Sequence, residues 1–152
     1  ADKFLRYGPI DTKSKSLTNN LFKSLTHKKK FNIFGNIHNT FDGTPVRDFI
    51  HVDDLALIHY KSLKYLIKHR KNQITNCGYG IGYSVKQVAE IFKSSVNKQF
   101  SYKYVKKRTG DISYMVASTK KINKILNLRF KNNSLKKMII SELNWKKKEL
   151  IK

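Results

Sequence analysis

The stretch that most constrains this chain is residues 31–59, which read FNIFGNIHNTFDGTPVRDFIHVDDLALIH. A short apolar run ends at Gly35, the turn sequence DGT follows, and an apolar segment then leads to two acids that open a helix. Arg47 follows the turn in a chain that has 27 lysines and only five arginines. Arginine carries a planar fork of donors that binds a phosphate or a carboxylate at two points, so we predict that Arg47 binds an anionic group.

Hydrophobic periodicity predicts alternating strands and helices, and therefore an α/β fold. Apolar or alternating segments predict strands at residues 4–7, 31–34, 46–52, 73–77 and 100–105. Helical spacing predicts helices at residues 18–26, 53–68, 84–94, 118–126 and from residue 134 onward. The predicted helix caps are Thr18 or Asn19, Asp53, Ser84 in a capping box with Gln87, Ser118 and Ser134.

The segment IFGNIHNTFDGTPVRDFIHVDDLALIH closely resembles the UDP-glucose 4-epimerases, in which an IFG strand, a DGT loop and a run of the type VRDYIHV-x-DLA occur together. Related sugar-nucleotide dehydratases usually lack this combination. The resemblance implies the C-terminal part of an extended short-chain dehydrogenase/reductase, with the last strands of a Rossmann-type sheet and a small α/β substrate-binding subdomain. It implies that residues 1–152, which begin at Ala1 and not at methionine, are only this part, and that the N-terminal NAD-binding half lies outside the chain.

The resemblance also implies six substrate-binding residues, which are Asn20, Leu21, Phe34, Arg47, Arg108 and Asp111. In the family, the two matching arginines bind the diphosphate of UDP-glucose or UDP-galactose, the aspartate bonds the ribose, and the other positions fix the nucleotide. An alternative for Arg47 is a structural ion pair with Asp42 or Asp48. Tyr7 falls in a segment that the family places close to the cofactor NAD, so the resemblance implies a contact of Tyr7 with this cofactor.

The family's reaction is NAD-dependent epimerisation of the sugar at C4, which belongs to galactose metabolism. A tyrosine removes the proton of the 4-hydroxyl while NAD takes the C4 hydride, and the hydride returns on the other face of the sugar. The two Tyr-x-x-x-Lys matches of this chain are Tyr60/Lys64 and Tyr102/Lys106, close to the roughly 1.4 that chance gives with so much lysine. We therefore predict no catalytic residue in this chain and no epimerase activity of the chain alone.

The net charge of +22 would by itself indicate a polyanionic partner. Lysines spread along the whole chain supply nearly all of it, and no nucleic-acid-binding motif is present. Binding of specific nucleic acid is therefore a lesser alternative, and a stand-alone nucleotide-sugar-binding protein without catalysis is another. The single cysteine, Cys77, and the lack of an apolar run of membrane-spanning length favour a cytoplasmic protein without membrane contact. The full-length form is compatible with a homodimer.

Two further patterns are not interpreted as sites. His51, Asp53, Asp54 and His59 lie close in the sequence, but no second cluster of ligands accompanies them, so we predict no metal site. The glycines of GYGIGYS are spaced G-x-G-x-G, which differs from the dinucleotide-binding fingerprint. We interpret these glycines as turn residues.

Overall fold

The computed structural model describes residues 1–2, 4–9, 16–96 and 98–150. Helices and short strands are mixed along the chain, which confirms the predicted α/β class. In chain order the elements are α1 (Leu17–Thr26), β1 (Phe31–Phe34), β2 (Val46–Asp48), α2 (Val52–His69), β3 (Gly82–Ser84), α3 (Val85–Ser95), β4 (Tyr102–Val105), β5 (Tyr114–Met115), α4 (Lys120–Leu126) and α5 (Leu135–Leu150). Within this described part, no helix has the length and apolarity that a membrane span requires.

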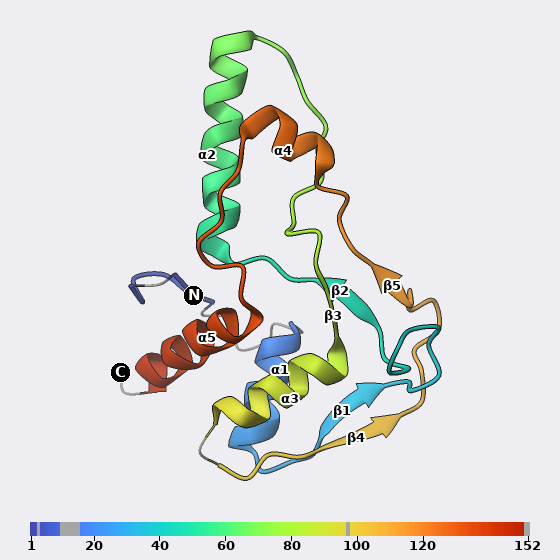
Figure 1. Cartoon of the computed structure of the whole chain (residues 1–152). Coiled ribbons are helices and arrows are strands. Elements are labelled where there is room, and N and C mark those ends of the chain that lie inside the picture. Colours follow the sequence, from blue (N-terminus) through green and yellow to red (C-terminus); the bar gives the residue numbers. More distant parts are fainter. Residues whose placement is uncertain (3, 10–15, 97, 151–152) are drawn as a thin grey trace.

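Three helices, α1, α3 and α5, and the parallel strand pair β1–β4 form the base of the molecule around one apolar core (Figure 1). In β1, the side chains of Phe31 and Ile33 are buried and that of Asn32 is exposed, as expected for a strand with one buried face. The buried apolar residues of the core are Leu21, Phe31, Ile33, Val88, Ala89, Phe92, Phe100, Leu135, Ile139 and Leu143. The last helix, α5, contributes Leu135, Ile139 and Leu143 to this core.

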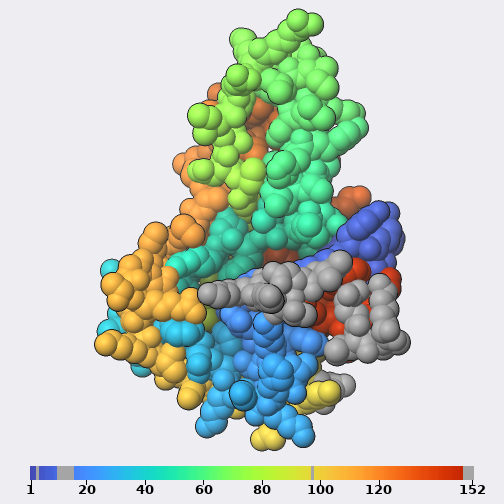
Figure 2. All heavy atoms as spheres, turned by 180° about the vertical axis from the view of Figure 1, so that it is seen from behind, coloured from blue at the N-terminus to red at the C-terminus, as the bar shows by residue number. Residues whose placement is uncertain are grey.

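A second sheet has the strand order β3–β2–β5, in which β2 runs antiparallel to β3 and parallel to β5. From it, α2, α4 and residues 70–80 rise away from the base, as Figures 1 and 2 show. We call these three segments the tower. Lys61 joins α2 to the end of α4, where its Nζ donates to the carbonyls of Leu126 and Asn127 at 3.2 and 3.0 Å.

The beginnings of α1 and α2 correct two predicted caps. Ser16, not Thr18 or Asn19, caps α1, and its hydroxyl accepts from the Asn19 N–H at 3.3 Å. His51, not Asp53, caps α2, and its Nδ1 accepts from the Asp53 N–H at 3.2 Å. A cap is the last residue outside the helix whose side chain reaches an amide two or three positions onward, and the predicted residues already lie inside their helices.

The other predicted caps have mixed outcomes. The capping box of α3 is confirmed, because the Ser84 hydroxyl accepts from the Gln87 N–H at 3.0 Å and the Gln87 side chain accepts from the Ser84 N–H at 2.9 Å. At α4 the prediction is wrong: Thr119, not Ser118, precedes the helix, and it makes no side-chain capping bond.

Two predicted strands are also wrong. Residues 4–7 form a turn in which the Asp2 carboxylate accepts from the N–H groups of Arg6 and Tyr7 at 2.6 and 3.0 Å. Residues 73–77 are not a strand, and Ile74 is 90% exposed instead of buried. A strand forms only where a neighbouring backbone pairs with it, and the described residues offer 73–77 no such partner. For the same reason the predicted strand at 46–52 is limited to β2, which β3 and β5 flank.

Candidate functional site

A cavity of about 230 Å³ lies between α1, β1, β2 and the loop that joins β4 to β5. Five of the six predicted substrate-binding residues line it: Asn20 from α1, Phe34 from β1, Arg47 from β2, and Arg108 and Asp111 from the loop. Its full lining is Leu17, Asn20, Phe31, Asn32, Phe34, Pro45, Arg47, Phe49, Val85, Arg108 and Asp111. We call it the arginine cavity.

Arg47 forms an ion pair with Asp111 in this cavity. Its Nη2 lies 2.7 Å from Oδ1 of Asp111, and each side chain is 22% exposed. Its Nη1 donates to the carbonyl of Val46 at 2.8 Å. The parallel pairing of β2 with β5 brings the two residues together, because Asp111 precedes β5 by three positions. A guanidinium has five N–H donors, so these two bonds orient it without using all of them.

The acids predicted as alternative partners of Arg47 bind other groups. Asp42 accepts from the N–H and the hydroxyl of Thr44 at 2.9 and 2.7 Å. Asp48 accepts from two backbone N–H groups of the loop before β3, at 3.1 and 2.9 Å. An ion pair of Arg47 does exist, but its partner is Asp111, which lies 64 positions away in the sequence.

Hydrogen bonds of Asp42 hold the DGT turn that precedes Arg47. Gly43 has a φ of +76°, as the turn prediction requires. The Asp42 carboxylate also accepts from the hydroxyl of Ser84, which ties the turn to the start of α3. Burial alone would raise the pKa of this carboxyl, but the hydrogen bonds from Ser84 and Thr44 lower the pKa below its ordinary value. The turn, and with it the beginning of β2, is therefore fixed on α3.

Arg108 lies over the ring of Phe34, with its guanidinium carbon 3.7 Å from the ring centroid. The β1–β4 register explains the contact, because Phe34 stands opposite Val105, three residues before Arg108. A guanidinium stacked on an aromatic ring keeps its N–H donors at the edge, where they can reach an anion. The family resemblance predicted both residues for the site but did not predict their contact.

The remaining predicted residues differ in position. Asn20 is half-buried and lines the arginine cavity. The Leu21 side chain is fully buried in the core, so a role in the site falls to its main chain. Tyr7 is not among the lining residues; its side chain is 73% exposed, and its main chain is bonded to Asp2 through both N–H and C=O, at 3.0 and 2.9 Å. The binding roles of all three residues stay predictions.

A second cavity of about 640 Å³ adjoins the arginine cavity and shares part of its lining, including Phe34 and Arg108. Its other lining residues are basic or polar and comprise Lys23, Ser24, His27, Lys29 and Lys30. No acid is among the residues that line it, so its field attracts anions. The sequence did not predict these side chains for the site, because three consecutive lysines are typical of a solvated turn. Only the packing of α1 and β1 shows that Lys29 and Lys30 lie in the same cavity as Arg108.

The acids and histidines near the start of α2 bind protein groups. His51 Nε2 lies 3.2 Å from the Ser141 hydroxyl, and a ring nitrogen of His59 lies 2.8 Å from the carbonyl of Leu55. Among the described residues no group of three or more His, Cys, Asp or Glu side chains is arranged to hold a metal ion.

Comparison with known proteins identifies the family. The sequence profile described as "NAD dependent epimerase/dehydratase family" matches residues 3–78, half of this chain. The UDP-glucose 4-epimerase of Halalkalibacterium halodurans is 35% identical over 124 residues, which are 82% of this chain and 37% of the relative. This chain belongs to the NAD dependent epimerase/dehydratase family.

Solved structures of the family share the fold of this member. The UDP-glucose-4-epimerase of Stenotrophomonas maltophila, with bound NAD and formylated UDP-arabinopyranose, is 26% identical with a TM-score of 0.86, over 95% of this chain and 43% of that chain. The epimerase of Bifidobacterium longum, in complex with NAD+ and UDP, is 31% identical with a TM-score of 0.73, over 90% of this chain and 42% of that chain. The resemblance seen in the sequence is thus confirmed, and this member corresponds to the C-terminal portion of these epimerases and spans less than half of their length.

Proposed function

We propose that this chain is the substrate-binding part of a UDP-glucose 4-epimerase and that it holds the UDP moiety of UDP-glucose or UDP-galactose in the arginine cavity. The observation that carries the proposal is the convergence of Asn20, Phe34, Arg47, Arg108 and Asp111 on one cavity. The similar Bifidobacterium longum epimerase was solved with UDP, which supports the class of ligand.

The two arginines would bind the diphosphate as charge-assisted forks. Each fork has its own orienting contact: the Asp111 carboxylate for Arg47 and the Phe34 ring for Arg108. Donors that are held before the ligand arrives lose less conformational freedom when it binds, which increases affinity. The diphosphate would therefore enter a site whose geometry is largely set in advance.

Asp111 would serve both the arginine and the ribose. Its Oδ1 accepts from Arg47 at 2.7 Å. A carboxylate has a second oxygen with its own lone pairs, so Oδ2 would accept from a ribose hydroxyl. One side chain would thus couple the position of the diphosphate to that of the sugar of the nucleoside.

The chemistry itself is assigned to residues outside this chain. Bound NAD would supply hydride transfer, and Tyr7, the residue of this chain predicted to contact it, is 73% exposed and lies outside the arginine cavity. Tyr60 is 55% exposed on α2 and also lies outside this cavity. Tyr102 donates its hydroxyl proton to Glu90 at 2.6 Å, and this hydrogen bond raises the pKa of Tyr102, whereas a catalytic base needs a lowered one.

The chain alone is accordingly expected to bind substrate without converting it. Anchoring the UDP moiety still contributes to catalysis in a complete epimerase, because the nucleotide stays fixed while the keto sugar turns over. The alternative, a stand-alone nucleotide-sugar-binding protein, would use the same cavity. It would differ from the epimerase part only in having no catalytic half. Homodimerisation of the full-length form stays a prediction.

Calorimetric titration of the folded chain with UDP and UMP tests the proposal. UDP should bind at one site at least tenfold more tightly than UMP, because only the diphosphate reaches both arginines. Equal affinities, or no binding of UDP by a chain whose helicity is verified by circular dichroism, would refute it. A parallel titration with a single-stranded RNA at increasing salt separates binding in the cavity from general attraction of polyanions, which declines steeply with salt.

A further inference from the structure

The loop of residues 106–113, between β4 and β5, carries both Arg108 and Asp111 of the arginine cavity. The structure describes this loop in full, and the loop forms neither helix nor strand. Its one internal backbone hydrogen bond runs from the N–H of Asp111 to the carbonyl of Arg108 at 3.3 Å. A segment with so few internal bonds is easily displaced. The positions of both side chains therefore depend on how the ends of the loop are attached.

Main-chain hydrogen bonds attach each end of this loop to a different strand. At its start, the N–H of Gly35, directly after β1, donates to the carbonyl of Val105 at 2.9 Å. At its end, the N–H of Val46 in β2 donates to the carbonyl of Ser113 at 2.8 Å. These bonds fix the two ends separately. A side chain that connects β1 with the end of the loop would fix them relative to each other.

The imidazole of His38 makes this connection, and the residue is only 4% exposed. Its Nε2 lies 3.3 Å from the carbonyl oxygen of Phe34, at the end of β1, and its Nδ1 lies 3.2 Å from the hydroxyl of Ser113. The ring of Phe34 contacts Arg108. Ser113 follows Asp111 by two positions. One buried ring thus touches the strand and the loop that carry the orienting contacts of the two arginines.

The partners of the His38 ring determine its tautomer. The carbonyl of Phe34 can only accept, so the bond requires the proton on Nε2. In a neutral imidazole Nδ1 is then an acceptor, to which the hydroxyl of Ser113 can donate. Both ring nitrogens of this buried side chain are satisfied in this way. The structure therefore predicts the Nε2–H tautomer for His38.

Local contacts hold the backbone of His38 and leave room for its ring. The N–H of His38 donates to the carbonyl of Gly43 in the DGT turn at 2.9 Å, and the carbonyl of His38 accepts from the N–H of Thr40 at 2.8 Å. Gly35 has a φ of +86°, and a Cβ at this position would lie 2.8 Å from Nε2 of His38. The turn and this glycine together place the imidazole between β1 and the loop.

We propose that His38 is a positioning residue of the arginine cavity and keeps the Phe34 ring and the Asp111 carboxylate in a fixed relative position. His38 is not among the residues that line the cavity, so it acts through these two groups. Side chains that are ordered before a ligand arrives lose less conformational freedom when it binds. The proposal rests on the proposed function for its ligand, whereas the connection made by the ring exists without one.

The test compares the variants His38→Phe and His38→Gln by calorimetric titration with UDP. Phenylalanine keeps a ring but makes neither hydrogen bond, so UDP affinity should fall about five- to thirtyfold, since two side chains must then be ordered on binding. Glutamine has a donor and an acceptor on one amide and should bind UDP within about threefold of the parent chain. Weaker binding by His38→Gln than by His38→Phe would indicate a packing role and overturn the proposal.

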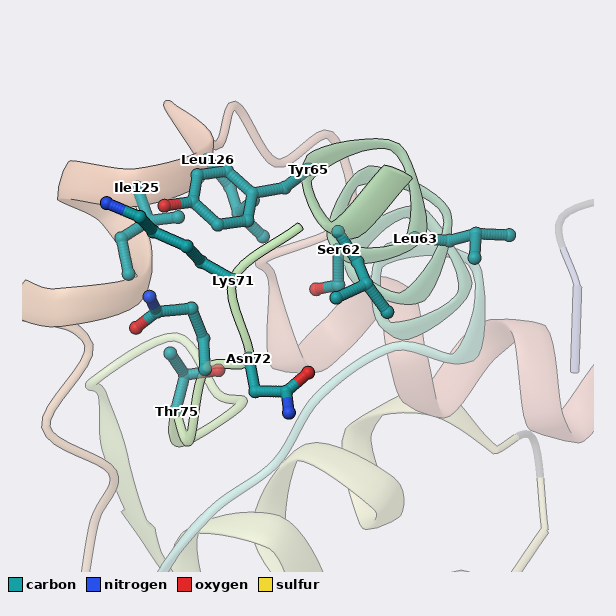
Figure 3. A pocket seen from close by; sticks show the side chains of 10 residues that line it. Ser62, Leu63, Tyr65, Lys71, Asn72, Thr75, Ile125 and Leu126 are labelled. Carbon is teal, nitrogen blue, oxygen red and sulfur yellow. The ribbon is translucent and has the colours of Figure 1, made fainter. Parts of the chain in front are cut away.

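Two controls separate positioning from stability. His51→Phe removes an equally buried ring that caps α2, so it should lower the Tm and leave UDP affinity unchanged. Ser113→Ala removes one of the two bonds of His38 and should weaken UDP binding less than His38→Phe does. Its matched control is Ser62→Ala, because Ser62 is also half-buried but lines a separate cavity in the tower, which Figure 3 shows.

Two measurements without ligand distinguish this proposal from the proposed function. Nitrogen NMR shifts of the imidazole should show the Nε2–H tautomer of His38. The amide of Val46, which donates to Ser113, should exchange with solvent at least tenfold faster in His38→Phe than in the parent chain. If both results hold but the parent chain does not bind UDP, the proposed function alone is rejected. If the parent chain binds UDP and His38→Phe binds it equally well, the positioning role alone is rejected.

Discussion

The hydroxyl of Tyr79 donates a hydrogen bond of 2.6 Å to the carboxylate of Asp54 and so joins the loop before β3 to the start of α2. The same carboxylate accepts from the N–H of Asn132 at 3.0 Å, and the Tyr79 oxygen accepts from the N–H of His51 at 3.1 Å. Asp54 is only 3% exposed, and a buried carboxylate is tolerated only with such donors. Three distant segments are thus fixed at the foot of the tower.

We expect Tyr79→Phe to lower the free energy of unfolding by about 1–3 kcal/mol, because it removes a hydrogen bond to a buried carboxylate and leaves the His51 N–H without its acceptor. Urea denaturation followed by circular dichroism measures the loss. Tyr114→Phe is the control, since Tyr114 is 61% exposed. A loss no larger than that of the control would show that the hydroxyl does not support the tower.

The sequence predicted some local features of this fold correctly, whereas it predicted the non-local ones poorly. The capping box of Ser84 and Gln87 and the turn at Gly43 depend on residues within a few positions of one another. The strand predicted at 73–77 fails because a strand needs a partner, and local sequence does not show whether one is present. The cap of α2 was missed because an imidazole nitrogen in the place of a cap oxygen is not a common signal.

For the site, the resemblance supplied the residues and the structure supplied their relations. Nothing local predicts that Arg47 pairs with Asp111 or that Arg108 stacks on Phe34, because these contacts follow from the pairing of β2 with β5 and of β1 with β4. The basic lining of the second cavity, beside Arg108, depends on the same packing. Charge counts cannot distinguish the lysines of this lining from those spread over the rest of the surface.

The pair of Arg47 and Asp111 leads to a binding prediction. Arg47→Lys keeps the charge but loses the planar fork, so UDP affinity should fall about tenfold or more, which corresponds to about 1.5–3 kcal/mol. Asp111→Asn should also weaken binding, because Arg47 loses its ionic partner. Since the two side chains touch, the loss in the double variant should be smaller than the sum of the single losses.

Calorimetry with UDP measures all three variants, and Arg129→Lys is the control, because Arg129 is exposed and lies outside the lining of the arginine cavity. If Arg47→Lys binds UDP as tightly as the parent chain, the ion pair with Asp111 is purely structural and Arg108 carries the diphosphate alone. Strictly additive losses would show that the two residues do not act as one unit.

The contact of Arg108 with the Phe34 ring predicts a small loss of UDP affinity in one variant and a larger loss in another. Phe34→Leu keeps the cavity apolar but removes the ring, and a cation–π contact at an accessible site is worth about 0.5–1 kcal/mol, so UDP affinity should fall roughly two- to fivefold. Arg108→Lys removes the fork itself and should cost about tenfold or more. The same titration checks both, and an unchanged affinity of Phe34→Leu would show that the ring does not orient the guanidinium.

We expect His51 to make the stability of the tower dependent on pH. Its Nδ1 accepts from the N–H of Asp53 at 3.2 Å and caps α2. Burial lowers the pKa of His51 below its ordinary value of about 6.5, and it outweighs the opposite effect of the Asp53 carboxylate. Because the pKa is lower in the folded state, folding favours the neutral ring. This contribution is complete above about pH 6.5 and is lost as the pH falls through the folded-state pKa.

We therefore expect the free energy of unfolding to decline between about pH 7 and about pH 5, before most carboxylates titrate. His51→Asn keeps a capping oxygen but has no titratable ring, so it should flatten this slope. His59→Asn is the control, since His59 is exposed on the same helix, and it should keep the slope of the parent chain. Urea denaturation at a series of pH values measures the three proteins. An equally steep decline in His51→Asn would mean that another group causes the pH dependence and that protonation of His51 does not uncap α2.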